Sequence, residues 1–390
     1  AITLPTIPFY VQETFGGSVS NVSSLAAVFF AAQFFASPIL GSLSDRYGRR
    51  PILILSQFGT VAALLLSGLA PTLAFLYAAR VIDGITGGNI AVAEAYLSDI
   101  TDKSERTQGL GIVSAGYNGA LLIGPIIGGI LAVRVGFRIP FFIAAGISAC
   151  TIVLTYFLLP KVNHKGGQPR KTPPATPKQD NMSTQVSKWG RLLGIPFVSL
   201  IIIIAVSERM AYFIFQPTFP LWIEQVMLKG ADTSTIQTSV GWLLAYMSLF
   251  NILTQIWLIG PASRLLREKR LIILGTLMSG LGWYLLTTIP TLTFTIILLP
   301  VISMGIAFAL PSLTALVTFV APEQQRGYAI GFLQANKNIG RIAGAILGGI
   351  VFDYVSPQAP MQTSAVLALC CCAMGIYLLF KTKHLGVTYD

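Results

Sequence analysis

Charged residues are scarce in this sequence. Of its 390 residues, 11% are charged and 54% are apolar, whereas about 25% of residues are charged in a typical soluble domain. The mean hydropathy is +0.71. The length alone would suggest about two or three soluble domains, but this composition excludes them and predicts a polytopic membrane protein.

Histidine and cysteine are also scarce, which excludes several kinds of chemistry. Both histidines, His164 and His384, lie in predicted cytoplasmic segments, so no predicted span offers an imidazole as a proton carrier. The cysteines, Cys150 and Cys370–Cys372, lie in apolar spans and have the spacing of neither a disulfide framework nor a metal site. The sequence has no Walker loop, no His-Glu-x-x-His and no Gly-x-Ser-x-Gly motif, which argues against an enzyme. We therefore expect no cofactor and no metal.

Acidic residues are fewer than basic ones. The sequence has 26 Lys and Arg against 15 Asp and Glu, which gives a formal net charge of +11. Most of the basic residues fall in alternate loops between apolar runs, and this pattern marks those loops as cytoplasmic. The excess therefore sets the membrane topology, and we expect no nucleic-acid partner.

One short basic segment separates two charge-free apolar runs. Residues 41–50 read Gly-Ser-Leu-Ser-Asp-Arg-Tyr-Gly-Arg-Arg, and each flanking run is long enough to cross a hydrocarbon core of about 30 Å as a helix. We expect a tight cytoplasmic turn in which Gly41 lets the helix ends approach and Gly48 has a positive φ. The residues that we assign to this cytoplasmic gate are Gly41, Asp45, Arg46, Gly48, Arg49 and Arg50.

The spacing Gly-x-x-x-Asp-Arg-x-Gly-Arg-Arg resembles the signature loop of the major facilitator superfamily, and most of all that of its drug/proton antiporters. An ordinary positive-inside loop is the simpler alternative. The resemblance implies that Asp99, which follows the fourth span, pairs with the cluster of Asp45 and Arg49. Such pairing would hold the two halves of a transporter together on the cytoplasmic side in its outward-open state.

The fourth and fifth predicted spans extend this resemblance. Arg80 and Gly84 match an Arg-x-x-x-Gly motif of the antiporters, and the fifth span matches their glycine-rich motif except at Ala120. Small residues allow helices to pack closely and a proline allows a helix to bend, so we expect a bending helix between the halves; a static packing motif is the alternative. The matching residues are Gly111, Gly124, Pro125, Gly128 and Gly129.

The two halves of the sequence repeat each other. Arg106 recurs as Arg326 and Asn118 as Asn338, an offset of 220 residues that four glycines share. Residues 5–13 resemble residues 217–225, which close a full span, so we expect the chain to begin inside its first helix. The resemblance implies an all-α, twelve-helix major facilitator fold of two parallel halves with a substrate site near the midplane. The expected domains are residues 1–160, a disordered basic linker at 161–193, and residues 194–390.

Charges inside the predicted spans are candidates for function, because each costs about 2.5–3.5 kcal/mol to insert. Glu208 lies close to the midplane of the seventh span and is our candidate proton carrier. Arg80 and Asp83 are one turn apart and could neutralise each other, while Glu94 could reach the cytoplasmic surface. The candidate substrate and proton residues are Arg80, Asp83, Glu94, Tyr117, Asn118, Glu208, Arg209, Gln216, Asn251, Asn336, Lys337 and Arg341.

Two of these cations are specific to the second half. Lys337 and Arg341 are four residues apart on the predicted eleventh span and share a face, whereas Tyr117 and Leu121 occupy the corresponding positions of the first half. The repeated architecture therefore does not require these charges. If they face the cavity, the substrate should carry a negative group; the alternative is that intramembrane acids neutralise them.

These features predict a secondary active transporter that exports a small amphipathic, drug-like substrate in exchange for protons by alternating access. The resemblance is greatest to the tetracycline/proton antiporters. Those proteins use acids in the first and ninth spans and a histidine in the eighth. Here the ninth span has no acid, the eighth has no histidine, and the relevant part of the first span is expected to be absent, which argues against tetracycline itself. The alternatives are a carrier of an anionic metabolite or lipid without obligatory proton coupling, and a non-transporting receptor or scaffold. We expect a monomer in the bacterial inner membrane whose partners are a small-molecule substrate, protons and the lipid bilayer.

The topology can be tested with single cysteines in a cysteine-free background. Cysteines that replace Ser44, Ser183 and Ser263 should resist an impermeant thiol reagent added to intact cells, because these positions lie in predicted cytoplasmic segments. A cysteine that replaces Ser234 should react. The opposite labelling pattern would overturn the topology.

Overall fold

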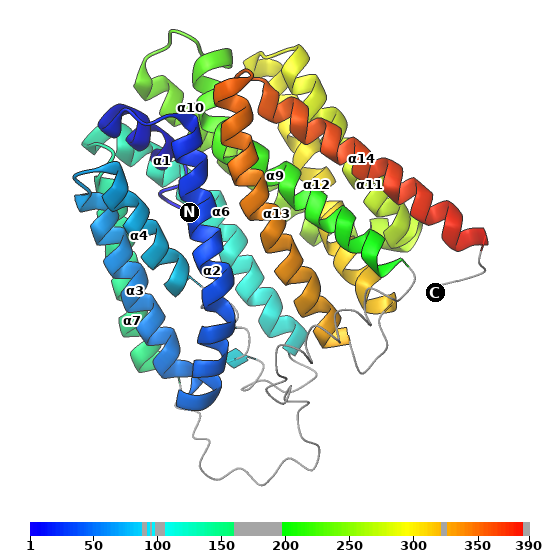
Figure 1. Cartoon of the computed structure of the whole chain (residues 1–390), viewed down its shortest axis with the longest axis horizontal. Helices are drawn as coiled ribbons and strands as arrows, with labels where there is room; N and C mark the ends of the chain where they lie inside the picture. Colours follow the sequence, from blue (N-terminus) through cyan, green and yellow to red (C-terminus); the bar gives the residue numbers. More distant parts are fainter. Residues whose placement is uncertain (88–91, 94–95, 98–105, 160–196, 321–325, 385–390) are drawn as a thin grey trace.

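The computed structural model is a bundle of helices (Figure 1). It describes residues 1–87, 92–93, 96–97, 106–159, 197–320 and 326–384. Seven of the described helical segments are long and apolar enough to cross a membrane. The predicted linker at 161–193 and the predicted site residues Glu94 and Asp99 lie outside the described residues.

The described elements follow the predicted order of spans. Those of the N-terminal half are α1 (Thr6–Phe9), the π-helix η1 (Tyr10–Thr14), α2 (Val19–Tyr47), α3 (Arg49–Leu69), α4 (Leu73–Thr86), α6 (Arg106–Val135) and α7 (Ile139–Leu158). Those of the C-terminal half are α9 (Val198–Trp222), the π-helix η2 (Ile223–Met227), α10 (Thr233–Leu253), the π-helix η3 (Thr254–Leu258), α11 (Ile259–Thr288), α12 (Leu292–Val320), α13 (Arg326–Tyr354) and α14 (Ala359–His384).

The predicted cytoplasmic turn at residues 41–50 is much shorter than expected. Helix α2 continues to Tyr47 and α3 begins at Arg49, so only Gly48 lies between them. Its φ of 97° is positive, as predicted. The expected close approach at Gly41 is wrong, because a Cβ atom added there would meet nothing within 4 Å. The Arg49 guanidinium donates a hydrogen bond to Ser44 Oγ over 2.6 Å, and the side chain of Asp45 lies outside what the structure describes.

The second half contains the same kind of turn. Residues 260–270 are helical as part of α11, and the kink is confined to Arg267 at φ 60°. Glycine adopts a positive φ without strain, whereas a residue with a side chain, such as Arg267, is destabilised by roughly 1–3 kcal/mol in an unfavourable backbone region.

Ser44 is fully buried, so the exposed Ser42 is the better position for the labelling test of the topology.

The repeat detected in the sequence has a structural counterpart. The segment with Pro5 and Pro8 leads into η1, and the segment with Pro217 and Pro220 leads into η2, so both copies end in a π-helical turn. A proline removes a backbone donor and disturbs regular α-helical hydrogen bonding. The two copies therefore end their helices in the same way at the same edge of the bundle.

The halves contact each other mainly through two helix pairs, α2 with α13 and α6 with α10, at their predicted extracytoplasmic ends. Both contacts are backbone to backbone. A Cβ atom added at Gly349 would lie 2.7 Å from Ser20 Cα, and one added at Gly241 would lie 2.8 Å from the Pro125 carbonyl oxygen. Any larger side chain at these positions would force the halves apart at this end.

The same helices separate toward the predicted cytoplasmic end. Figure 1 shows α2 and α13 close together at one end of the bundle and diverging toward the other. Toward the predicted cytoplasmic ends of α6 and α13, a Cβ atom added at Gly116 or Gly331 would meet nothing within 4 Å. The structure is therefore open toward the predicted cytoplasmic end and closed at the opposite end.

One acidic side chain joins the halves at the closed end. The Asp353 carboxylate on α13 accepts hydrogen bonds from the backbone N–H groups of Val19 (3.3 Å) and Ser20 (2.7 Å), in the first turn of α2. The first N–H groups of a helix have no partner within the helix, and the helix dipole favours a negative charge there. Asp353 is not among the residues predicted from the sequence, although a lone acid at the end of an apolar span is a recognisable signal.

We expect Asp353→Asn to weaken the closed extracytoplasmic end, because loss of the charge removes about 1 kcal/mol of charge–dipole stabilisation, or about a fivefold population shift. A cysteine that replaces the buried Ser23, beside Gly349, should then react faster with an impermeant maleimide. The matched control is Asp232→Asn, because Asp232 caps the first turn of its own helix α10 and does not connect the halves. Equal labelling rates in the two variants would contradict this role.

Candidate substrate cavity

A cavity of about 560 Å³ lies between the two halves. Helices α2 and α6 line it from the N-terminal half, and α9, α10, α12 and α13 line it from the C-terminal half. Its volume lies in the range of small-molecule sites, about 300–1,000 Å³. The candidate residues that line it are Tyr117, Arg209, Gln216, Asn251, Lys337 and Arg341.

Other candidate residues lie elsewhere. Arg80 and Asp83 line an adjoining pocket of about 410 Å³. Asn336 and Glu208 line neither pocket; the Asn336 amide donates to the Phe332 carbonyl over 2.8 Å, on its own helix. The side chain of Asn118 lies outside what the structure describes.

Three cations line one wall of the cavity. Lys337 Nζ donates to Thr314 Oγ1 over 3.0 Å, and the Arg341 guanidinium donates to Asn338 Oδ1 over 3.1 Å. The Nε atoms of Arg209 and Arg341 are buried without a hydrogen-bond partner. Within the described part of the chain, no carboxylate lies within ion-pairing distance of these three side chains.

Aromatic rings from both halves cover the end of Arg341. Its guanidinium lies 5.6 Å from the ring centroid of Phe30 on α2 and 5.7 Å from that of Phe213 on α9. The two rings contact each other edge to face at 4.8 Å, so this contact crosses from one half to the other. Phe30 is not among the residues predicted from the sequence, because it lies in a run of apolar residues without any distinguishing pattern.

The glycine motif of α6 serves close packing. A Cβ atom added at Gly128 would overlap the Ile2 carbonyl group, and one added at Gly129 would lie 3.0 Å from the Gln237 carbonyl oxygen of α10. The helix is continuous from Arg106 to Val135 across Pro125. In this conformation, the motif positions α6 against both the start of the chain and the opposite half.

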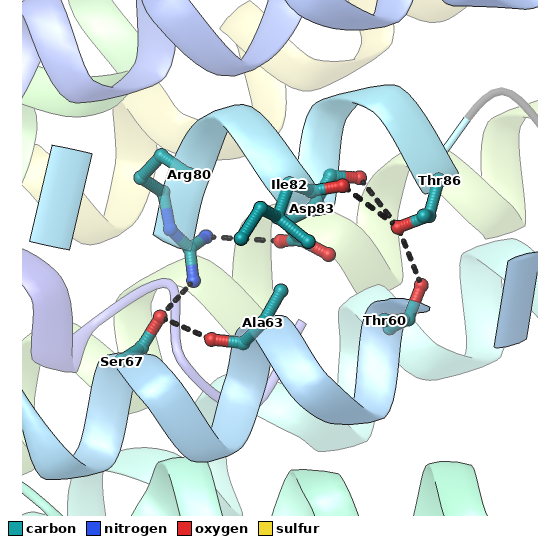
Figure 2. Close-up of polar contacts among 7 residues, drawn as sticks. All are labelled: Thr60, Ala63, Ser67, Arg80, Ile82, Asp83 and Thr86. Atoms are coloured by element: carbon teal, nitrogen blue, oxygen red, sulfur yellow. Dashed lines mark hydrogen bonds and ion pairs between the residues drawn. The ribbon is translucent and has the colours of Figure 1, made fainter. Parts of the chain in front are cut away.

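Arg80 and Asp83 form an ion pair with an N–O distance of 3.3 Å (Figure 2). Arg80 also donates to Ser67 Oγ over 3.1 Å, and Ser67 Oγ donates to the Ala63 carbonyl over 2.8 Å. Both charged side chains are largely buried. The two charges therefore neutralise each other, which is the alternative that their spacing of one helical turn suggested.

Glu208 points away from the cavity, into the C-terminal half. It is 1% exposed, and it accepts a hydrogen bond from Ser279 Oγ of α11 over 3.3 Å. Its second oxygen, Oε2, is buried and has no hydrogen-bond partner. Arg209, the next residue of α9, lines the cavity, so consecutive residues present an acid to the interior of one half and a cation to the space between the halves.

We expect Asp83→Asn to destabilise the protein, because removal of one partner of a buried ion pair leaves the other charge uncompensated, at a cost of roughly 3 kcal/mol. The melting temperature of the purified protein in detergent should fall. The double variant Arg80→Gln with Asp83→Asn should recover part of the loss, because no buried charge remains. A double variant less stable than Asp83→Asn would show that Arg80 stabilises the protein through other contacts.

Comparisons with known proteins agree on one family. The family model described as Major Facilitator Superfamily matches residues 1–236 and 230–388. The tetracycline resistance protein, class C, of Escherichia coli is 30% identical over 351 residues, covering 89% of this chain and 84% of that protein. Multidrug resistance protein 1 of Bacillus subtilis is 26% identical over 98% of this chain and 92% of its own length.

Solved structures agree on the fold. A bacterial homologue of the human lysosomal transporter Spinster, in an inward-facing and occupied conformation, matches with a TM-score of 0.75 at 15% identity, covering 96% of this chain and 92% of that chain. The human organic anion transporter MFSD10 matches with a TM-score of 0.66 at 18% identity, covering 90% of this chain and 83% of that one. At such identities the likeness concerns the fold alone.

Proposed function

Because the chain belongs to the Major Facilitator Superfamily, we propose that it is a secondary active transporter that exports a small amphipathic compound in exchange for protons. The observation that carries the proposal is the cavity between the halves, which is closed by glycine contacts at one end and open at the other. Alternating access needs such a cavity and two end contacts that form in turn. The bacterial inner membrane is the proposed location.

The relatives support a drug-like substrate. Their names describe resistance to tetracycline and to multiple drugs, and export is the direction of transport that gives resistance. Beside its polar groups, the cavity has an extended apolar lining that includes Leu121, Phe213 and Leu244. A flat or aromatic compound with a polar end would match this lining.

Glu208 is the proposed proton carrier. A carboxyl group can bind and release a proton. Glu208 lies at the same level of α9 as the cavity, but its side chain is buried and does not line the cavity. Arg209 follows it on the same helix. A change in the charge of Glu208 would therefore change the electrostatic potential at Arg209, which lies beside the substrate. This is one physical route from proton binding to substrate release.

Proteoliposomes with an imposed proton gradient test this function. The probes are three dansyl compounds that end in a carboxylate, a neutral amide or a primary ammonium group. Glu208→Gln should abolish gradient-driven accumulation of a transported probe and keep its exchange without a gradient, because the side chain can no longer ionise. The control Ser279→Ala removes the hydrogen bond to Glu208 and keeps the carboxyl group, so it should keep coupling.

Undiminished proton-driven accumulation in Glu208→Gln would remove Glu208 from this role. Absence of gradient-driven transport for every probe in the unmodified protein would contradict proton-coupled export of such compounds.

A further inference from the structure

The charge of the cavity is one-sided. Its lining includes Arg209, Lys337 and Arg341, and the residues that line it include no Asp or Glu. Two of the three cations have a buried Nε atom without a hydrogen-bond partner. Buried charge without compensation is costly. A bound group with negative charge and hydrogen-bond acceptors would therefore stabilise this wall.

A close helix crossing brings these cations together. Arg209 lies on α9, and Lys337 and Arg341 lie on α13 with Gly340 between them. A Cβ atom added at Gly340 would lie 2.5 Å from the Val206 carbonyl oxygen and 3.2 Å from Arg209 Cβ. Because Gly340 lets the two backbones touch, the cations are held beside one another despite the repulsion between their charges. The arrangement belongs to the C-terminal half alone and does not depend on how the halves are oriented.

The nearby acids do not neutralise this wall. Glu208 is hydrogen-bonded to Ser279 on the far side of α9, and Asp83 is paired with Arg80 in the adjoining pocket. Neither carboxylate lies within ion-pairing distance of the three cations in the described part of the chain. No described residue that lines the cavity is acidic, so a negative charge there would come from a bound ligand.

The space beside the cations is mostly apolar, although the paired Arg80 and Asp83 also line it. Arg341 lies over the rings of Phe30 and Phe213, and both rings also line the adjoining pocket of about 410 Å³. Other residues of that pocket include Leu25 and Pro217. A ligand that places an anionic group at the cations would therefore place its remaining part against aromatic and aliphatic side chains.

We propose that the cavity binds amphipathic organic anions, with a carboxylate, sulfonate or phosphate group held by Arg209, Lys337 and Arg341 and an apolar body in the pocket beside Phe30 and Phe213. This inference rests on the proposed function, because it names the substrate class of the same cavity. Arginine offers a fork of donors that matches such anions, and lysine adds a compact charge. Because the three cations belong to one half, the anion would stay in contact with them until the cavity opens on the other side.

Equilibrium binding in detergent, followed by dansyl fluorescence, tests the substrate class without any gradient. The unmodified protein should bind the carboxylate probe at least about tenfold more tightly than the ammonium probe, since a charge-assisted hydrogen bond contributes about one to two orders of magnitude in affinity. The double variant Lys337→Gln with Arg341→Gln should lose about 10- to 100-fold in affinity for the carboxylate probe and less than about threefold for the amide.

The matched control is Lys229→Gln with Arg264→Gln, which removes the same two charges from exposed positions of the same half. It should bind all three probes as the unmodified protein does. The variant Lys337→Arg keeps the charge and should keep the preference for the carboxylate. Correct folding of each variant is checked by its elution in size-exclusion chromatography.

Equal losses for all three probes in the cavity variant, or no preference for the carboxylate in the unmodified protein, would overturn the proposal. The second outcome does not depend on the folding of any variant. Carboxylate-selective binding without gradient-driven transport would contradict the proposed export and leave the anion site standing, so the two failures are distinguishable.

Discussion

The arrangement of this protein depends on helix backbones that touch where glycine replaces a side chain. Gly349 against Ser20 and Gly241 against Pro125 close the space between the halves at one end, and Gly340 joins α9 to α13 within one half. Inside a membrane, burial of apolar side chains gives little drive for helices to associate, so close packing and polar contacts have to supply it. The same glycines that hold the helices together therefore decide where a cavity remains.

The polar contacts follow from this packing. Where α2 meets α13, the close approach brings the Asp353 carboxylate to the free N–H groups of the opposite helix. Where α9 meets α13, it brings cations side by side at the cavity wall. The first contact satisfies both partners, and the second leaves polar atoms without partners. This contrast separates a contact that stabilises one conformation from a surface arranged for a ligand.

Much of the architecture was predictable from the sequence. The apolar runs, the positive loops and the repeated positions, such as Asn118 with Asn338, indicate helical spans in two related halves, and the family match agrees. The short turn at Gly48 was predicted in its backbone conformation and not in its extent, because the polar residues around it favour a loop by composition although they continue the helices. Glu208 was predicted as an intramembrane acid, but its orientation away from the cavity was not.

The sequence by itself determined the class of this protein, its membrane spans, its internal repeat and the family to which it belongs, because hydropathy and motif spacing are local properties. Only the tertiary structure decided which side chains meet. Arg209 and Lys337 are far apart in the chain and share one cavity wall, while the adjacent Glu208 and Arg209 face different surroundings. Periodicity cannot reveal this in a membrane helix, since lipid and protein interior are both apolar and the face that looks into the cavity is set by helix rotation and crossing.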